Sequence, residues 1–386
     1  MTISVLEVSL YKNLGVDVSK KGIESFKMGI DNLAPGSFCV VHQDPGDVLM
    51  GMVLHTDSAG SKPIQAYLMY KETGDTQWFR GLAQDALAMN INDVICVGAS
   101  PVSFVDYLAF NTLNIDRVRL LSEISIGFTE CKKILSDGGV PVLFAGGETA
   151  DLPDLIRTLD VCVTILGRVP LNKIITGDKI TPGDVIVGLR SGGKSLSEAK
   201  ENSGIMSNGH TLARSCLLSP SYIEKYPELS HPGRIRFTGR FRIDDEPDEL
   251  GITVGEALLS PTRLYAPAAS AILKQVEVHA MVHNTGGGQT KCLRLGKGIH
   301  YIKDSLPDPD PIFKLIQNES GADMREMYQD FNMGVGFEVI VPDESADEVI
   351  RISKRFGVDA QIIGRCEKHA LNSLTIKTGN EESKYQ

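Results

Sequence analysis

Three acidic residues in the first half of the sequence stand beside glycine, and each is expected at the end of a strand. Carboxylate oxygens are the hard ligands that Mg²⁺ prefers, and Mg²⁺ usually completes its shell with water and substrate phosphates. Backbone N–H groups of glycine loops can bind those phosphates because no Cβ blocks the approach. An acid in one turn is most often a cap or a solvated side chain, but three at equivalent strand ends favour a metal and phosphate site. They are Asp57 in TDSAGSK (56–62), Asp93 in NDVICVGASP (92–101) and Glu148 in GGETADLP (146–153).

Lys62 closes the first of these loops. One interpretation places its ammonium group over a phosphate, where it would neutralise charge. The other is an ordinary surface lysine.

The second half of the chain offers two further loops. Ser207, Asn208 and Gly209 precede His210 and an expected helix (211–218), and a helix start with free N–H groups binds anions. A plain N-cap turn would use the same residues.

His283 stands at the end of an expected strand, directly before Asn284, Thr285 and three glycines (286–288). A lone histidine is more often a satisfied core residue. Beside a phosphate-type loop it becomes a candidate acid or base.

The expected elements of the first half place its loops at strand ends. Apolar runs predict strands, and apolar residues at helical spacing predict helices. Asp116 is a plausible N-cap for a long helix that Gly138 and Gly139 end. The predicted strands are 48–55, 94–97, 103–110, 140–145 and 158–169, and the other predicted helix is 76–91.

The stretch 170–184 contains turn residues and is the predicted domain boundary. We therefore expect an α+β fold of two domains, 1–172 and 173–386. In the second domain, strands are predicted at 185–190, 278–283, 335–341, 359–366 and 371–377, and helices from about 208 and at 262–275, 311–319 and 343–356.

Residues 234–243 (RIRFTGRFRI) alternate arginine with apolar residues around Thr-Gly, a pattern typical of a β-hairpin. Five acids follow between Asp244 and Glu249. The favoured interpretation is a solvated surface hairpin whose arginines pair with these acids. The alternative is a lid or dimer arm that brings arginine to a phosphate.

The composition excludes several classes of protein. The 386 residues are 42% hydrophobic and 23% charged, which excludes disorder and fibre. A net charge of −10 disfavours nonspecific nucleic-acid binding. The seven cysteines form no C-x-x-C pair and no Cys/His cluster in the sequence, which argues against disulfides and structural zinc. We see no signal peptide and no run that spans a bilayer, and expect a cytoplasmic protein without membrane contact.

The motifs together resemble the phosphoribosylformylglycinamidine cyclo-ligase family, the aminoimidazole ribonucleotide synthetases of purine biosynthesis. The resemblance runs from about residue 10 to 367. Besides the three acidic loops, the segments that carry it are LYKNLGVD (10–17), SNGHTLAR (207–214), SPTRLY (260–265), HNTGGG (283–288) and EMYQDFNMGVGF (326–337).

The resemblance implies a fold and an activity. N-terminal sheets of two subunits would pair into a barrel, C-terminal α+β domains would flank it, and ATP would lie between the domains near the dimer interface. ATP would phosphorylate the formamide oxygen of formylglycinamidine ribonucleotide, and a neighbouring nitrogen would then close the imidazole ring as phosphate leaves. The implied cofactors are ATP and Mg²⁺, and the implied partner is a second copy of the chain.

The resemblance also implies roles for the motif residues. Asp57, Asp93 and Glu148 would hold Mg²⁺ and, with Gly60, Lys62, Gly98, Gly146, Gly147 and Thr149, the nucleotide. The substrate would contact Ser207, Asn208, Gly209, Thr285, Gly286, Gly287 and Gly288. The candidate catalytic residues are His283, His210 and Lys62.

The chain departs from the family in several places, among them a stretch after GGETADLP (146–153) that is shorter than usual. Residues 31–39 are poor in glycine where the family has a glycine-rich loop, Met206 stands where a histidine commonly precedes Ser-Asn-Gly, and 221–250 resemble an insertion. His210 would have to replace the missing histidine. Two alternatives therefore stay open: an enzyme of the same fold that acts on another amide or small acceptor, and a nucleotide-binding paralogue without catalysis.

Overall fold

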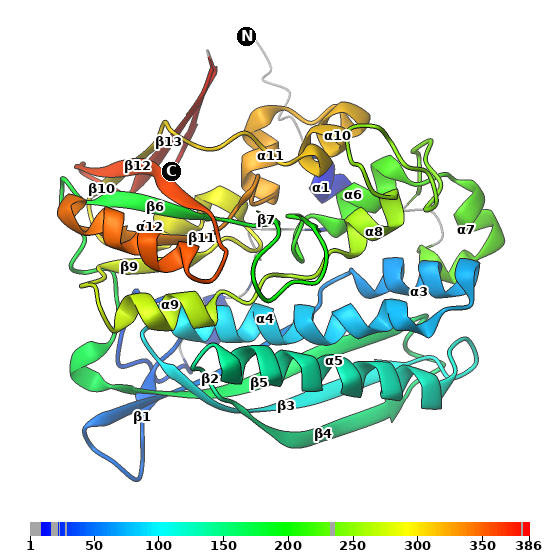
Figure 1. Cartoon of the computed structure of the whole chain (residues 1–386), viewed down its shortest axis with the longest axis horizontal. Coiled ribbons are helices and arrows are strands. Elements are labelled where there is room, and N and C mark those ends of the chain that lie inside the picture. The colour runs from blue at the N-terminus through cyan, green and yellow to red at the C-terminus, as the bar shows by residue number, and fades with distance from the viewer. Residues whose placement is uncertain (1–8, 17–21, 23, 28, 232–235, 380) are drawn as a thin grey trace.

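The computed structural model describes residues 9–16, 22, 24–27, 29–231, 236–379 and 381–386 (Figure 1). It contains two principal sheets, one in each half of the chain, with helices between and around them. The first sheet ends at Pro170 and the second begins at Val185, so the predicted boundary at 172/173 falls in the connection between them.

The first sheet has the strand order β1-β2-β5-β3-β4. All of its neighbouring strands pair antiparallel except β3 and β4, which are parallel. Its strands are β1 (His42–Gln43), β2 (Met50–Ser58), β3 (Ser100–Phe110), β4 (Leu143–Asp151) and β5 (Leu159–Pro170).

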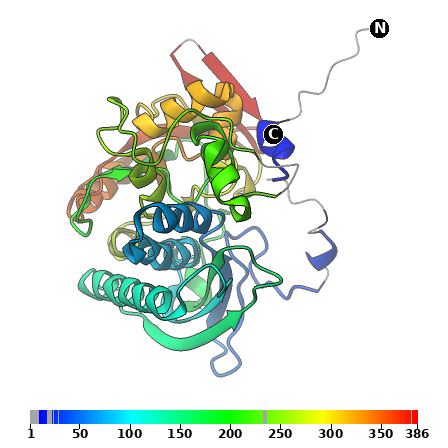
Figure 2. The same cartoon turned by 90° about the vertical axis from the view of Figure 1, so that its right-hand side faces the viewer.

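Helices cover one face of this sheet and leave the other face open (Figures 1 and 2). α5 begins as predicted, because the Asp116 carboxylate accepts a hydrogen bond from the Arg119 N–H at 3.0 Å. The helices of this half are α1 (Leu10–Asn13), α2 (Glu24–Lys27), α3 (Pro63–Thr73), α4 (Arg80–Cys96) and α5 (Arg117–Asp137), with short 3₁₀ turns η1 (Thr76–Phe79) and η2 (Leu171–Lys173).

The second sheet has the order β14-β13-β10-β12-β6-β11-β9, and only β10 and β13 are parallel. Its strands are β6 (Val185–Arg190), β9 (Ala280–His283), β10 (Ile299–Lys303), β11 (Val335–Val341), β12 (Ala360–Lys368), β13 (Ser373–Thr378) and β14 (Glu381–Tyr385); β7 (Gly192–Gly193) and β8 (Asn202–Ser203) form a separate small pair. The helices of this half are α6 (His210–Leu217), α7 (Ser221–Lys225), α8 (Val254–Leu259), α9 (Ala266–Leu273), α10 (Pro311–Ser320), α11 (Met324–Asp330) and α12 (Ala346–Lys354), with 3₁₀ turns η3 (Pro227–Leu229), η4 (Gly288–Arg294) and η5 (Asp343–Ser345).

The helix α4 joins the two halves. It is buried on nearly every side from Leu82 to Cys96, because it packs on β2 and β5 and also contacts β9 and α9 of the second half. The predicted strand 94–97 is therefore wrong: these apolar residues are the last turn of α4 and the residue that follows it. A helix that is apolar all round cannot be told from a buried strand by a four-residue run.

The predicted hairpin at 234–243 is also wrong for the residues that the structure describes. Residues 236–240 form no strand, and Phe241 makes a single parallel bridge to Leu218. Arg242 does pair with Asp244 at 3.3 Å, as the surface interpretation expected. Arg234 and Ile235 lie outside the described residues, as does Asp17 of the 10–17 motif.

Across the described segments, no helix combines the length and apolar character needed to cross a membrane.

Candidate functional site

Charged and polar side chains from both halves of the chain meet where α4 runs between β2 and β9. His55 and Asp57 lie on β2, Asp93 lies on α4, and His283 is the last residue of β9. Lys291 belongs to η4, directly after the glycine loop, and its charge acts on both Asp57 and Asp93. We take this cluster as the candidate functional site.

His283 holds Asp93 in place as a neutral ring. Its Nδ1 donates to Oδ1 of Asp93 at 2.6 Å. The amide nitrogen of Asn92 lies 3.3 Å from Nε2 and also donates to the carbonyl of Arg263, while the Asn92 oxygen accepts from the N–H of Tyr265. The amide orientation is thereby fixed, so Nε2 accepts, and burial lowers the pKa of His283. The geometry suits a positioning residue, because both ring nitrogens are already bonded to protein.

Asp93 is an ionised carboxylate in a buried place. It is 7% exposed, and burial alone would raise its pKa. The charge of Lys291 and the hydrogen bond from His283 outweigh burial and lower the pKa of Asp93 to about 2.

His55 presents its second ring nitrogen to Asp93. Asn90 uses its amide nitrogen to donate to the carbonyls of Asp57 and Ala86, so its oxygen must be the atom that faces His55. Nδ1 of His55 therefore donates to this oxygen, at 2.8 Å. Nε2 of His55 then lies 3.6 Å from Oδ2 of Asp93, beyond the length of a direct hydrogen bond.

Asp57 is the second carboxylate of the site. Its Oδ1 accepts from the Ser58 N–H at 2.8 Å. Its pKa is raised, first by burial and also by the negative charge of Asp93, while His55 and Lys291 act in the opposite direction. Lys291 is 7% exposed, and its Nζ donates to the Thr285 hydroxyl. Two carboxylates and one ammonium group thus lie near enough for their charges to act on one another, and Asp93 and Lys291 are buried.

Glu148 does not join Asp57 and Asp93, which corrects the expectation that three acids converge within one chain. Asp57 lies in register with Val163, Asp106 and Gly147 across the sheet, which places Glu148 opposite Tyr107, one residue further along β4. Adjacent residues of a strand point to opposite faces, and β4 lies three strand spacings from β2, or about 14 Å. Glu148 is therefore exposed on the open face, whereas Asp57 points to the covered one.

Lys62 is neither a surface lysine nor a group placed over a phosphate. Its Nζ is fully buried and donates to Asp85 Oδ1 and to the carbonyl of Ser260, both at 2.7 Å. The hydroxyl of Ser207 donates to the same carboxylate oxygen at 3.0 Å, and Thr262 donates to it as well. These contacts tie the first glycine loop and α4 to the second half of the chain, so Lys62 has a structural role here.

The segment 207–214 packs against the loop 56–62. Arg214 donates to the Ser61 hydroxyl at 2.7 Å, and Asn208 donates to the carbonyl of Asn284 at 2.8 Å. Gly209 precedes α6 with φ +62°, and a Cβ there would overlap the ring of Phe331. The three motifs 56–62, 207–214 and 283–288 are therefore brought together, as predicted for loops of one site.

His210 is a packed core residue. Nε2 lies 2.8 Å from the carbonyl of Met206, Nδ1 lies 3.0 Å from the amide of Gln65, and the ring is 2% exposed. Burial, with a further contribution from the charge of Lys62, holds the pKa of His210 well below its usual value. This environment does not suit the acid or base that the sequence suggested.

The remaining predicted residues lie in loops, except Gly146, Gly147 and Thr149, which lie inside β4 because this strand continues past the predicted end at 145 to Asp151. Gly98 has φ +79° and ends α4, so its place in the motif has a structural reason. A Cβ at Gly147 would overlap the carboxylate of Asp106. Gly60 turns the chain from β2 into α3, Gly146 and Thr149 lie on β4, and Thr285, Gly286, Gly287 and Gly288 connect β9 to η4.

Two of the departures from the family pattern, the glycine-poor loop 31–39 and Met206, lie in this region. In the glycine-poor loop, Cys39 Sγ donates to the backbone carbonyl of Asp93 at 3.2 Å, and the ring of Phe38 lies 4.9 Å from the Lys291 ammonium. Met206 is buried with φ 57°, a left-handed conformation that is uncommon for a side chain of this size.

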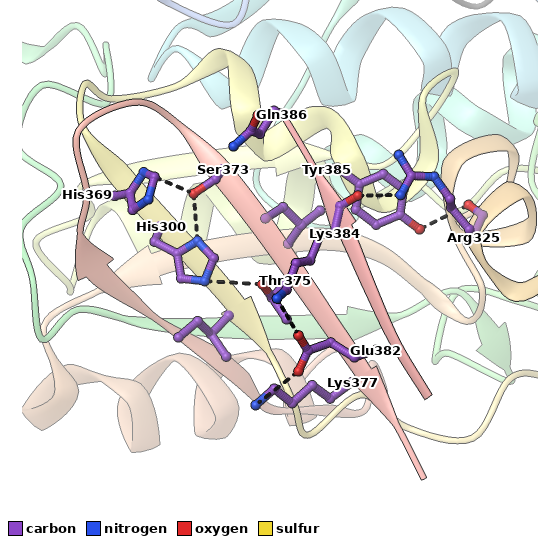
Figure 3. A pocket seen from close by; sticks show the side chains of 12 residues that line it. His300, Arg325, His369, Ser373, Thr375, Lys377, Glu382, Lys384, Tyr385 and Gln386 are labelled. Carbon is purple, nitrogen blue, oxygen red and sulfur yellow. Dashed lines mark hydrogen bonds and ion pairs between the residues drawn. The ribbon is translucent and has the colours of Figure 1, made fainter. Parts of the chain in front are cut away.

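A separate cavity of about 710 Å³ lies on the second sheet, lined by β10, β13 and β14 (Figure 3). Its charged groups are largely paired: Glu382 forms ion pairs with Lys377, at 3.6 Å, and with Lys384, at 2.9 Å. None of the motif residues lines it, so we do not assign the candidate site to this cavity.

Sequence reasoning missed Lys291, His55 and Asn90 as site residues. Each lies outside the acids and glycines of the motifs. His55 and Asn90 are 35 residues apart. Lys291 is bonded to nearby Thr285, but the carboxylates on which its charge acts, Asp57 and Asp93, belong to the first half of the chain. His55 directly precedes the first motif, and Lys291 follows the triple glycine within one helical turn; this proximity is the one available hint.

Comparisons with known proteins agree with the motifs. The profile of the AIR synthase related protein N-terminal domain matches residues 42–169, and that of the corresponding C-terminal domain matches residues 181–377. The phosphoribosylformylglycinamidine cyclo-ligase of Methanocaldococcus jannaschii is 36% identical over 366 residues, which cover 92% of this chain and 91% of the relative. The protein of that name from Methanobrevibacter smithii is 32% identical over 377 residues, covering 95% and 97%.

Solved structures show the same fold at low identity. Thiamine monophosphate kinase from Aquifex aeolicus has a TM-score of 0.55 at 13% identity, over 92% of this chain and 94% of that one. Phosphoribosylformylglycinamidine synthase II from Thermotoga maritima has a TM-score of 0.54 at 14% identity, over 94% of this chain and 48% of that one. These two structural similarities are evidence for the fold alone.

Proposed function

Because this chain belongs to the family of AIR synthase related proteins, we propose that it catalyses the ATP-dependent closure of the imidazole ring in purine biosynthesis. Formylglycinamidine ribonucleotide and ATP would give aminoimidazole ribonucleotide, ADP and phosphate. The observation that carries this proposal is the similarity, at 32–38% identity over 82–95% of the chain, to relatives named phosphoribosylformylglycinamidine cyclo-ligase.

The reaction requires mainly that the protein position the reactants and neutralise their charge. An amide oxygen is a poor leaving group, and its conversion to a phosphate ester replaces the loss of water by the loss of phosphate. Most of the protein's contribution to phosphoryl transfer is then to hold the reactants and to balance the developing charge.

The carboxylates of Asp57 and Asp93 fit a magnesium ion. They supply hard oxygen donors, and they lie close enough that the charge of Asp93 raises the pKa of Asp57. When bound, Mg²⁺ would neutralise charge on the triphosphate. His283 keeps Asp93 oriented and ionised, and Lys291, next to Thr285, would bind phosphate oxygen in the role that the sequence suggested for Lys62.

We further propose that the chain works as a homodimer through the open face of the first sheet. Apolar side chains are exposed there, with Leu54 at 62%, Tyr107 at 42% and Val105 at 39%. Glu148 faces the same side, opposite Tyr107. Pairing of this face would cover the apolar residues and bring Glu148 toward the partner's site, which would give it the metal role it does not have within one chain.

The dimer is tested by Tyr107→Arg. Light scattering of the wild-type chain should give a dimer mass, and the variant should give a monomer mass. A wild-type monomer at micromolar concentration would reject this part of the proposal.

The activity is tested with purified protein, Mg²⁺, ATP and formylglycinamidine ribonucleotide. ADP and aminoimidazole ribonucleotide should appear in equal amounts. ATP hydrolysis that depends on another acceptor would indicate a different enzyme of the same fold. ATP binding with no turnover would favour a paralogue without catalysis.

A further inference from the structure

Cys39, His55 and Asp93 lie in one cluster although 54 residues separate the first from the last. One ligand atom from each of the three lies within 4.8 Å of the other two. Cys39 comes from the glycine-poor loop, His55 from β2 and Asp93 from α4, so the cluster exists only in the folded chain. A thiol, an imidazole and a carboxylate are the side chains that bind Zn²⁺.

From this arrangement we propose that Cys39, His55 and Asp93 form a binding site for Zn²⁺ or a similar thiophilic divalent ion. Magnesium prefers oxygen ligands alone, so the thiol makes this a site of a different chemical class from the proposed magnesium site. The two sites share Asp93.

The orientation of His55 supports the proposal independently of the cluster. Asn90 accepts the hydrogen of Nδ1, so in the neutral ring it is Nε2, the nitrogen nearer Asp93, that carries the lone pair. A metal-binding histidine characteristically donates its other ring N–H to an oxygen in this way. Two acceptors 3.6 Å apart, Nε2 and Oδ2, are stabilised by a cation between them.

The spacing also suits a tetrahedral ion. Bonds of 2.0 to 2.3 Å in a tetrahedron place neighbouring ligand atoms about 3.3–3.8 Å apart. The distance from Nε2 to Oδ2 already lies in this interval. Sγ of Cys39 now lies 3.2 Å from the backbone carbonyl oxygen of Asp93, and its side chain would have to leave this hydrogen bond to reach the ion. The thiol proton would leave to solvent as the thiolate bonds the ion. The His55 side chain is 22% exposed and offers the ion a path from solvent, and water would fill the fourth position.

Cobalt provides the optical test, because Co²⁺ occupies zinc sites and absorbs visible light. Metal-free protein titrated with Co²⁺ should develop the visible bands of four-coordinate cobalt and a sulfur-to-cobalt charge-transfer band in the near ultraviolet. One equivalent of Zn²⁺ should remove both. Cys39→Ser should lose the charge-transfer band, whereas Cys162→Ser, which changes the most exposed of the seven thiols, should keep it.

Several outcomes would overturn the proposal: absence of the bands in the wild-type chain, their persistence in Cys39→Ser, or their loss in Cys162→Ser. If Cys39→Ser fails to fold, the wild-type chain gives the answer by calorimetry in two buffers of different ionisation enthalpy. Release of one proton for each Zn²⁺ supports thiolate binding, and release of none contradicts it.

The consequence for catalysis rests on the proposed function. Zn²⁺ in this site would engage Asp93 and so inhibit turnover that needs Mg²⁺ there. The Zn²⁺ concentration that halves turnover, with each protein compared to its own zinc-free rate, should be at least tenfold higher for Cys39→Ser than for Cys162→Ser. The optical titration needs no turnover, so failure of the metal site and failure of the proposed activity can be told apart.

Discussion

Replacement of Asp93 by asparagine separates the chemistry of the site from its contribution to stability. Asparagine keeps an oxygen that can accept from Nδ1 of His283, so the change removes chiefly the charge. In the folded chain the pKa of Asp93 is about 2, against 3.8 for an ordinary aspartate. A difference of one in the pKa corresponds to about 1.4 kcal/mol, and the ionised carboxylate therefore contributes about 2 kcal/mol to folding at neutral pH.

The pH dependence of that contribution follows from the direction in which folding moves the pKa. Because the pKa of Asp93 is lowered on folding, the stabilisation is complete well above about pH 4 and is lost as the pH falls toward 2. Urea unfolding should therefore show Asp93→Asn to be about 2 kcal/mol less stable than wild type at pH 7. Near pH 3 the difference in stability between the two proteins should be roughly half as large.

Turnover should respond far more strongly than stability. If Asp93 binds Mg²⁺ at the site, Asp93→Asn should lower kcat about 10²-fold or more, measured as ADP release that depends on the substrate. Asp184→Asn is the matched control, since Asp184 is also a buried partner of a histidine, His279, at 2.7 Å, and lies outside the site. Equal turnover in Asp93→Asn and wild type, or a chain that does not fold, would refute the reasoning.

Two further changes probe buried charges. Lys62→Met should lower the free energy of unfolding in urea by about 3–5 kcal/mol, because Asp85 would be left as an unpaired buried charge. The control is Lys133→Met, in an exposed pair with Asp137, which should lower it by less than about 0.5 kcal/mol. Equal effects of the two changes would contradict the structural role of Lys62. Asp330 is 3% exposed, and burial, with a further contribution from Glu326, raises its pKa to about 7, so stability should fall as the pH rises from about 4 to 7. Asp330→Asn should remove this slope and make the chain more stable than wild type at pH 8 by thermal melting; an unchanged slope would show that Asp330 does not cause it.

The sequence predicted much of the fold because most elements carry a local signal. Strands 185–190 and 335–341 match β6 and β11 to the residue, and the Asp116 cap begins α5. The last turn of α4 could not be predicted this way, because Val94, Ile95 and Cys96 are buried on a helix that is covered all round. The misplaced turn then put Asp93 at a strand end, when it lies on a helix.

Residues of the candidate site could be predicted where a single motif contains them. They could not be predicted where their role depends on a residue far away along the chain. Asp57, Asp93 and His283 were found from their glycine neighbours. The role of Lys62 depends on Asp85, 23 residues away, and on the carbonyl of Ser260, so neither sequence interpretation anticipated a buried ion pair. Cys39 and His55 are 16 positions apart and form no metal-binding spacing, so only the packing of a loop against β2 and α4 joins them.

The charges of the site predict the order in which its ligands bind. Two carboxylates and the ammonium of Lys291 leave one net negative charge where a triphosphate would lie, and the buried setting strengthens its effect. ATP alone should therefore bind weakly, and a divalent ion should reverse the local charge and permit binding. Calorimetry should show at least tenfold tighter binding of ATP with Mg²⁺ than with a chelator, and Lys291→Met should weaken binding in both conditions. Equally tight binding without a divalent ion would mean that the nucleotide is held by other residues and that Asp57 and Asp93 serve a different purpose.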